Sequence, residues 1–142
     1  MNDEDHFFLA PGIHDMSWDE FSAQFSFSQK RRDLLIGLKK TIEILKQVNC
    51  PVIYIDGSFV SQKNNPGDWD ACIDCSTQVV TALFKVFPFA DIDEQIRIYG
   101  GELYHARTEA DEYGTIFLDF FQQIKTDSAK KKGIVRINLE EK

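Results

Sequence analysis

The 142-residue sequence lacks any apolar run close to the roughly 20 residues that a membrane-spanning helix needs. It also lacks the basic beginning of a signal peptide, because it opens with the acidic segment Asn2-Asp3-Glu4-Asp5. No internal repeat or low-complexity linker interrupts the chain, and 43% apolar residues suffice for a full core. We therefore expect one domain spanning 1–142, cytoplasmic and without a membrane contact.

Cysteine is scarce, with only Cys50, Cys72 and Cys75. Cys72 and Cys75 form a single C-x-x-C pair, whereas a structural zinc tetrahedron of this type needs a second pair. Reduced thiols are the expected state, and a metal or redox role is the alternative.

Basic residues are outnumbered, 16 against 23 acidic residues, so the net charge is −7. This charge opposes tight binding to a polyanion unless positive charge is concentrated locally. Two clusters exist, Lys30-Arg31-Arg32 and Lys130-Lys131-Lys132, but neither is interleaved with aromatic residues that could stack on bases. We expect both clusters to be solvated and do not expect a nucleic-acid partner; RNA binding through them is the disfavoured alternative.

Capping signals and hydrophobic periodicity predict several helices. Ser17 followed by Glu20 is a capping box that opens a short helix to about residue 25. Apolar residues at three- and four-residue spacing predict a longer helix over 28–48. Ser76 and Asp91 are expected to cap two further helices, the second ending at Gly100.

Strands are predicted over 52–55, from 68 to 73, and over 102–107, 116–121 and 134–139. A polar turn joins 102–107 to 116–121 as a hairpin, so the sheet should be mixed. The fold class is therefore α+β, a mixed sheet packed against helices. We expect an N-terminal arm over 1–16, a helical lead-in over 17–48, the core over 51–123, and a C-terminal loop with an edge strand over 124–142.

The strand that starts at Asp68 contains the clearest chemical signal. Side chains alternate faces along a strand, so Asp68 and Asp70 should stand side by side on one face. Paired carboxylates offer hard oxygen ligands, which suit Mg²⁺ or Mn²⁺. Asp119 lies within the apolar run 115–121, where a buried carboxylate would need a cation or an arginine nearby. These three carboxylates are the predicted metal platform.

An apolar strand followed by Gly57-Ser58, then Asp68-Trp69-Asp70-Ala71, and later an acid between apolar residues at Asp119 resemble the signature of the polymerase-beta-type nucleotidyltransferase superfamily. Longer segments, including Pro11-Gly12-Ile13-His14 and Gly100-Gly101-Glu102-Leu103, are similar to a family of small nucleotidyltransferase-like proteins. This resemblance covers nearly the whole chain. Asp56 departs from the pattern, because the superfamily usually has an apolar residue there.

The resemblance implies a nucleotidyltransferase-like fold and a two-metal transfer of a nucleoside monophosphate from a nucleoside triphosphate to a hydroxyl. Asp68 and Asp70 would hold the metal ions, and Asp119 would bind the second ion and help to deprotonate the acceptor. Gly57 would let the backbone approach the triphosphate, while the Ser58 hydroxyl and the Lys63 ammonium would contact its oxygens.

Small members of the superfamily are often antitoxins, which implies a toxin protein as partner and acceptor. The alternative is a binding module that keeps the fold, acts through protein contacts and has lost catalysis. The retained acids Asp68, Asp70 and Asp119 favour the enzyme. Asp56 and the absence of a clear set of basic phosphate ligands favour the module.

Overall fold

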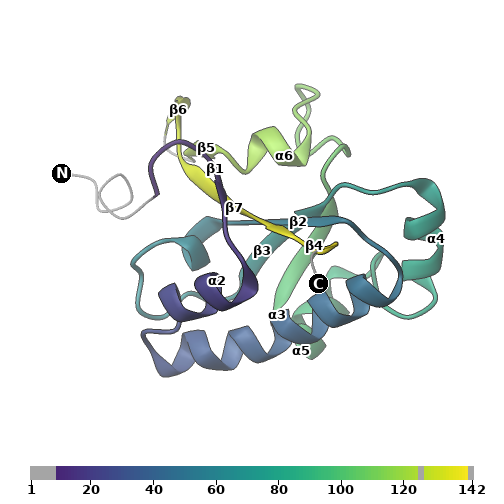
Figure 1. The fold of residues 1–142 in the computed structure, drawn as a ribbon. Helices are drawn as coiled ribbons and strands as arrows, with labels where there is room; N and C mark the ends of the chain where they lie inside the picture. The colour runs from purple at the N-terminus through teal and green to yellow at the C-terminus, as the bar shows by residue number, and fades with distance from the viewer. Residues whose placement is uncertain (1–8, 125–126, 141–142) are drawn as a thin grey trace.

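A five-stranded sheet is the centre of the fold, with strand order β1-β7-β2-β3-β4 (Figure 1). The structure, a computed structural model, describes residues 9–124 and 127–140, with side chains described for 9–123 and 132–140. The strands of this sheet are β1 (Gly12–Asp15), β7 (Gly133–Asn138), β2 (Val52–Asp56), β3 (Trp69–Ile73) and β4 (Gly101–His105). Strands β1 and β7 run parallel, as do β3 and β4, whereas β2 is antiparallel to both of its neighbours. The predicted α+β class with a mixed sheet is confirmed.

The C-terminal strand differs from the prediction in its place in the sheet. A strand was expected near 134–139, and β7 is that strand, but it is not at the edge. It pairs with β2 on one side and with β1 on the other, in a register that places Ile13 opposite Ile134. The N-terminal arm therefore provides the edge strand, because part of it adds to a sheet formed by distant segments; residues 1–8 of the arm lie outside the described residues.

The helices follow the predicted capping signals closely. They are α2 (Trp18–Gln24), α3 (Gln29–Gln47), α4 (Thr77–Phe84) and α5 (Ile92–Tyr99). The predicted caps at Ser17, Ser76 and Asp91 each accept a hydrogen bond from the backbone three residues later, as does Ser28 before α3. Gly100, with φ +80°, caps the C-terminal end of α5. These caps satisfy backbone donors that the first helical turn cannot pair internally. None of the helices in the described part of the chain is long and apolar enough to cross a membrane.

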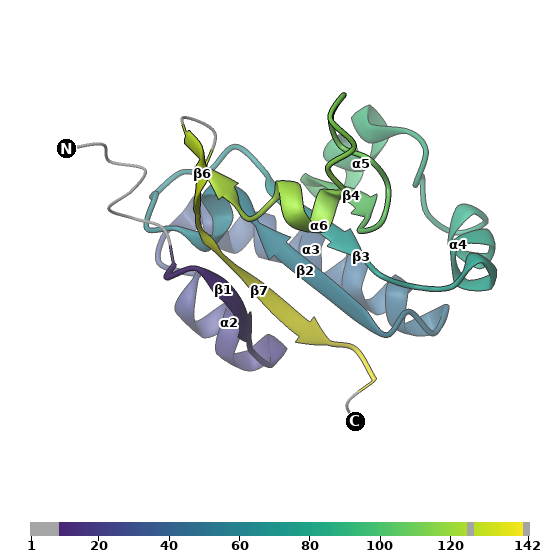
Figure 2. The same cartoon turned by 90° about the horizontal axis from the view of Figure 1, so that it is seen from above.

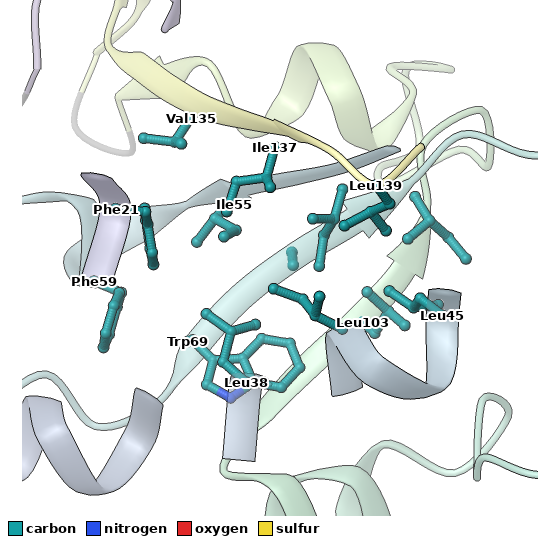
Figure 3. Packing of buried hydrophobic residues seen from close by; sticks show 14 of the residues in the cluster. Phe21, Leu38, Leu45, Ile55, Phe59, Trp69, Leu103, Val135, Ile137 and Leu139 are labelled. Carbon is teal, nitrogen blue, oxygen red and sulfur yellow. The ribbon is translucent and has the colours of Figure 1, made fainter. Parts of the chain in front are cut away.

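The main core lies between the sheet and the helices α2 and α3, which cover one face of it (Figures 1 and 2). Figure 3 shows Leu38 of α3 beside Trp69 of β3, and Leu103 of β4 nearby; all three are fully buried. The Trp69 indole N–H donates to the Tyr99 carbonyl oxygen at 2.9 Å. A β-carbon at Gly101 would lie 2.0 Å from the Trp69 ring, so only glycine fits under the indole. This packing sets how β3 and β4 lie side by side.

The opposite face of the sheet carries α6 (Phe117–Phe120), as Figure 2 shows. A smaller cluster that contains several aromatic residues lies under this helix. A strand was predicted over 116–121, and this prediction is wrong. Phe117 and Phe121, four residues apart, lie on one side of the helical turn with ring centroids 5.6 Å apart. The amides of Phe117 and Leu118 donate to carbonyls just beyond β4. A short apolar run fits a strand or a helical turn equally well, so tertiary contacts decide between them.

A loop was expected at the start of the C-terminal segment 124–142, and this is also wrong. Strands β5 (Gln123–Ile124) and β6 (Asp127–Lys131) form a separate two-stranded antiparallel sheet. Residues 125 and 126 of the expected loop lie outside the described residues. Strand preference depends strongly on context, and backbone pairing between two segments close in sequence can outweigh a composition that is unusual for strands.

Candidate metal centre

Three carboxylates come together where β3 and β4 begin. Asp68 immediately precedes β3, Asp70 lies in β3, and Glu102 lies in β4. One oxygen from each lies within 4.8 Å of the others, and all three side chains are half-buried. We call these three residues the acidic group. It exists because alternation puts Asp68 and Asp70 on one face, and because parallel pairing places Asp70 opposite Glu102.

The predicted pairing of Asp68 with Asp70 is confirmed, but Asp119 does not complete the group. Asp119 is exposed on the single turn of α6, not buried in a strand. Glu102 holds the third position in the acidic group, and the sequence analysis did not predict it there. The sequence did show that Glu102 is an acid at the start of the strand predicted over 102–107. It did not show that Glu102 lies close to Asp70, because that depends on which strand pairs with β3.

Tyr104 lies beside the acidic group, two residues after Glu102 on the same face of β4. Its hydroxyl donates to Glu102 Oε1 at 2.9 Å. Its ring stacks on Phe117 of α6, with centroids 4.2 Å apart. Burial raises the pKa of Tyr104, and so do the hydrogen bond to Glu102 and the negative charges of Glu102, Asp70 and Asp68. The phenol therefore remains a neutral donor that orients the Glu102 carboxylate.

Gly57 lies against the acidic group at the end of β2. Its φ is +75°, and a β-carbon there would stand 2.9 Å from Asp70 Oδ2. Any larger residue would be strained and would push on the Asp70 carboxylate. Gly57 is the first residue of a 3-10 helix, η1 (Gly57–Val60), which follows β2 directly. Glycine is thus required by both the backbone conformation and the closeness of Asp70.

Asp56 is a fourth acid next to this site. It lies directly opposite Asp70 in the antiparallel β2–β3 register, and it is 4% exposed. Its negative charge reaches the neighbouring Cys72, whose thiol pKa is raised by burial first and by the charges of Asp56 and Asp74 second. Asp56 therefore adds negative charge beside Asp70, on the same face of the sheet, without being a member of the acidic group.

Arg31 of α3 holds the loop between β2 and β3. A solvated cluster was predicted at Lys30-Arg31-Arg32, but Arg31 is fully buried, and the prediction is wrong for this residue. Its guanidinium donates to backbone carbonyls of the loop, with Nε to Lys63 at 2.9 Å, Nη1 to Phe59 at 2.6 Å, and Nη2 to Ser58 at 3.2 Å and Ser61 at 2.8 Å. One planar cation thus satisfies carbonyls along 58–63, because five N–H donors point outward from it in a fixed geometry.

Aromatic rings enclose the same guanidinium. Its central carbon lies 4.2 Å from the Phe27 ring centroid and 4.9 Å from that of Phe59. Burial lowers the pKa of Arg31 to about 10, so the side chain stays charged at neutral pH.

The second basic cluster, Lys130-Lys131-Lys132, was also expected to be solvated. Lys132 is buried, so this expectation is wrong for that residue. The side chains of Lys130 and Lys131 lie outside the described residues.

The loop that Arg31 holds includes the residues predicted to contact phosphate. The backbone carbonyl oxygens of Ser58 and Lys63 accept hydrogen bonds from Arg31. These bonds hold the main chain at both residues, while their side chains take no part in them. The Lys63 side chain is exposed. Ser61 tightens the loop, because its hydroxyl donates to the Ser58 carbonyl at 2.6 Å. The nucleotide-binding role of Gly57, Ser58 and Lys63 stays a prediction.

The arrangement is that of an α+β domain with an acidic, oxygen-rich site at the start of two parallel strands. The chain belongs to the family described as Family of unknown function (DUF6932), whose profile matches residues 1–138. Comparison with curated proteins finds no match, and neither does comparison with solved structures. Function therefore has to be inferred from the acidic group and the loop beside it.

Proposed function

We propose that this chain is a minimal, metal-dependent nucleotidyltransferase of the polymerase-beta type. It would transfer a nucleoside monophosphate from a nucleoside triphosphate to an acceptor hydroxyl. The observation that supports this proposal most is the acidic group: two carboxylates from one strand and one from its parallel neighbour, beside a Gly-Ser segment at the end of the preceding strand. The resemblance of the sequence to this superfamily supports the same conclusion.

The donor atoms of the acidic group fit a small divalent cation. Carboxylate oxygens are the ligands that Mg²⁺ and Mn²⁺ prefer. Oxygens around one magnesium ion lie at most about 4.2 Å apart, since each metal–oxygen bond is about 2.1 Å. The oxygens of Asp68, Asp70 and Glu102 lie within 4.8 Å of one another, so small side-chain rotations suffice to bring them to one ion.

In this proposal Asp68, Asp70 and Glu102 hold the metal, and Glu102 takes the place that was predicted for Asp119. The ions would neutralise triphosphate charge and lower the pKa of the acceptor hydroxyl. Tyr104 keeps Glu102 oriented through its 2.9 Å hydrogen bond. Gly57 lets the Asp70 carboxylate lie close to the backbone at the end of β2, and Ser58 and Lys63 would contact the phosphates from the loop that Arg31 holds.

The acceptor is proposed to be a hydroxyl on a partner protein. The described residues form one sheet with its covering helices and a small hairpin, and they include no separate domain that could bind a large acceptor. Small members of the superfamily that the sequence resembles are often antitoxins, and we propose this kind of partnership with a toxin for the present chain.

Asp56 favours a second candidate function, a binding module without catalysis. A buried acid directly opposite Asp70 adds negative charge where a triphosphate would have to approach. Such a charge weakens phosphate binding unless the metal ions offset it. The module would keep the fold and act through contacts with a partner protein.

Calorimetric titration separates the two functions. The protein is titrated with ATP, GTP, CTP and UTP, each with and without Mg²⁺ or Mn²⁺. The enzyme proposal predicts metal-dependent binding of at least one nucleotide, lost by tenfold or more in Glu102→Gln and in Asp70→Asn. Asp119→Asn is the matched control, because it removes one exposed carboxylate outside the acidic group.

Absence of nucleotide binding by the wild type with either metal would overturn the enzyme proposal and favour the module. Equal loss in Asp119→Asn and Glu102→Gln would contradict the assignment of Glu102. Where binding is seen, incubation with nucleoside triphosphate labelled at the α-phosphate tests transfer, because a transferred nucleotide keeps that label on the acceptor.

A further inference from the structure

Cys50 and Cys75 come together in the fold although 24 residues separate them in the sequence. Cys50 lies two residues before β2, and Cys75 lies two residues after β3, at the same end of this antiparallel strand pair. Cys50 belongs to the main core and Cys75 packs against this core, while the Cys50 thiol donates to the Val52 carbonyl oxygen at 3.6 Å. Both are free thiols, with Cys50 buried and Cys75 half-buried.

The backbone holds Cys50 firmly in this position. Helix α3 is followed by its C-cap residue Val48 and then by Asn49, whose φ is +64°. The Asn49 amide donates to the Lys46 carbonyl at 3.1 Å, and the Cys50 amide donates to the Leu45 carbonyl at 2.9 Å. This pair of hydrogen bonds is the Schellman motif, in which the residues after a helix are tied back to its last turn.

The C-x-x-C spacing of Cys72 and Cys75 does not bring these two residues together. Cys72 is fully buried in the aromatic cluster on the α6 face of the sheet. Cys75 instead packs against the main core, which includes Cys50. Cys50 is therefore the partner that the fold offers to Cys75.

The surroundings of Cys75 favour its thiolate. The neighbouring Cys50 thiol lowers the pKa of Cys75 to about 7 by favouring its thiolate, with help from the His105 imidazole and against burial and the charge of Asp74. His105 Nε2 lies 3.1 Å from the Cys75 carbonyl oxygen, so the ring is held beside this residue. Arg107 pairs with Asp74 at 3.1 Å. Thiolates, not thiols, are the reactive nucleophiles.

We propose that Cys50 and Cys75 form a thiol pair that a peroxide oxidises to an intramolecular disulfide, with Cys75 as the reacting and Cys50 as the resolving cysteine. This site is separate from the acidic group, since it lies at the opposite end of the β2–β3 pair from Asp56 and Asp70. It does not depend on the proposed nucleotidyl transfer.

The reaction has two steps. The Cys75 thiolate attacks one oxygen of hydrogen peroxide, the O–O bond breaks, and a sulfenic acid forms while the second oxygen leaves as water after taking up a proton. Cys50 sulfur then attacks the Cys75 sulfur and displaces hydroxide, which leaves as water with the Cys50 proton. Two thiols and one peroxide thus give one disulfide and two waters; the sulfurs lose two electrons and the peroxide gains them.

The disulfide would close a ring that contains β2, η1 and β3, and with them Asp68 and Asp70. A cross-link restricts the unfolded chain more than the folded one, so it stabilises the fold. Oxidation should therefore raise the midpoint of thermal unfolding by several degrees, and reduction by dithiothreitol should reverse the rise.

The test begins with reduced protein freed of reductant and exposed to one equivalent of hydrogen peroxide. Free thiols titrated in denaturant with dithionitrobenzoate should fall from three to one, with the protein still monomeric on a non-reducing gel. Tryptic peptides 47–63 and 64–85 should be joined, and fragmentation should place the bond on Cys75. This mapping uses the wild type, so it does not depend on a variant that folds.

Two variants check the assignment. Cys72→Ala should fall from two free thiols to none, whereas Cys75→Ser should keep both of its thiols under the same treatment. Three thiols remaining in the oxidised wild type would overturn the proposal. A bond mapped to Cys72, or loss of two thiols in Cys75→Ser, would also overturn it.

Discussion

Gly57 and Asp70 approach each other so closely that a β-carbon on Gly57 would stand 2.9 Å from Asp70 Oδ2. Gly57→Ala should therefore displace the Asp70 carboxylate and strain a residue whose φ is +75°. We expect a loss of about 1 kcal/mol or more in the free energy of unfolding and at least tenfold weaker metal-dependent nucleotide binding. Urea unfolding and calorimetry measure the two effects. Gly67→Ala is the control, because a β-carbon there meets nothing within 4 Å. Equal effects in both variants would contradict the prediction.

Arg31→Met should be strongly destabilising. The change removes the donor from the carbonyls of Ser58, Phe59, Ser61 and Lys63 and leaves several of them buried. Leaving such groups without a donor costs about 1–3 kcal/mol each, so we expect a loss of about 3 kcal/mol or more. Chemical denaturation measures it.

Lys30→Met is the control for Arg31→Met, because Lys30 is the preceding residue, has the same charge and is exposed. This change should alter the free energy of unfolding by less than about 0.5 kcal/mol. If Arg31→Met behaves like Lys30→Met, the guanidinium does not hold the loop. Protease sensitivity within 58–65 provides a local readout, because the loop should be cut faster in Arg31→Met.

Gln95 connects α5 to the outer edge of β4. Its Oε1 accepts from the Leu103 amide at 2.6 Å, and its Nε2 donates to the Phe89 carbonyl at 3.0 Å; the side chain is fully buried. Gln95→Leu would leave the Leu103 amide buried without an acceptor, at a cost of about 1–3 kcal/mol. Thermal unfolding tests this prediction beside Gln78→Leu, which alters an exposed residue of α4. A cost no greater than that of the control would contradict the role of Gln95.

Asp15 and Arg136 join β1 to β7 through two hydrogen bonds of 2.6 and 2.8 Å. The hydrogen bond to Arg136 lowers the pKa of Asp15 below the ordinary value of an aspartate, and the positive charge adds to this effect. A carboxyl whose pKa is lower in the folded state contributes stability above its unfolded pKa and loses it as the pH falls through the folded pKa. Because the pair is exposed, the contribution is small and screened by salt.

The midpoint of thermal unfolding should fall less steeply below about pH 4 in Asp15→Asn than in the wild type. At still lower pH the two proteins should have nearly the same midpoint, because Asp15 is then protonated in the wild type as well. Glu43→Gln, an exposed change on α3, serves as the control. If the unfolding midpoint of Asp15→Asn fell with pH as steeply as that of the wild type, the prediction would be contradicted.

Much of the helical structure could be predicted from the sequence alone. Ser17, Ser76 and Asp91 cap their helices as expected, because a cap is a hydrogen bond between residues three apart. The closeness of Asp68 and Asp70 was also predictable, since alternation along one strand is a local property. These features depend on contacts within a few residues of the chain.

The rest of the site was decided by contacts between distant segments. Glu102 joins Asp70 because β4 pairs with β3 in parallel, while Asp119 turns outward because α6 packs its aromatic rings against Tyr104. Arg31 is buried because the loop after β2 presents its carbonyls to α3. Local sequence determines helix caps and side-chain alternation along a strand. Only the tertiary structure decides which strands are neighbours and which charges are buried, because those depend on residues far apart in the chain.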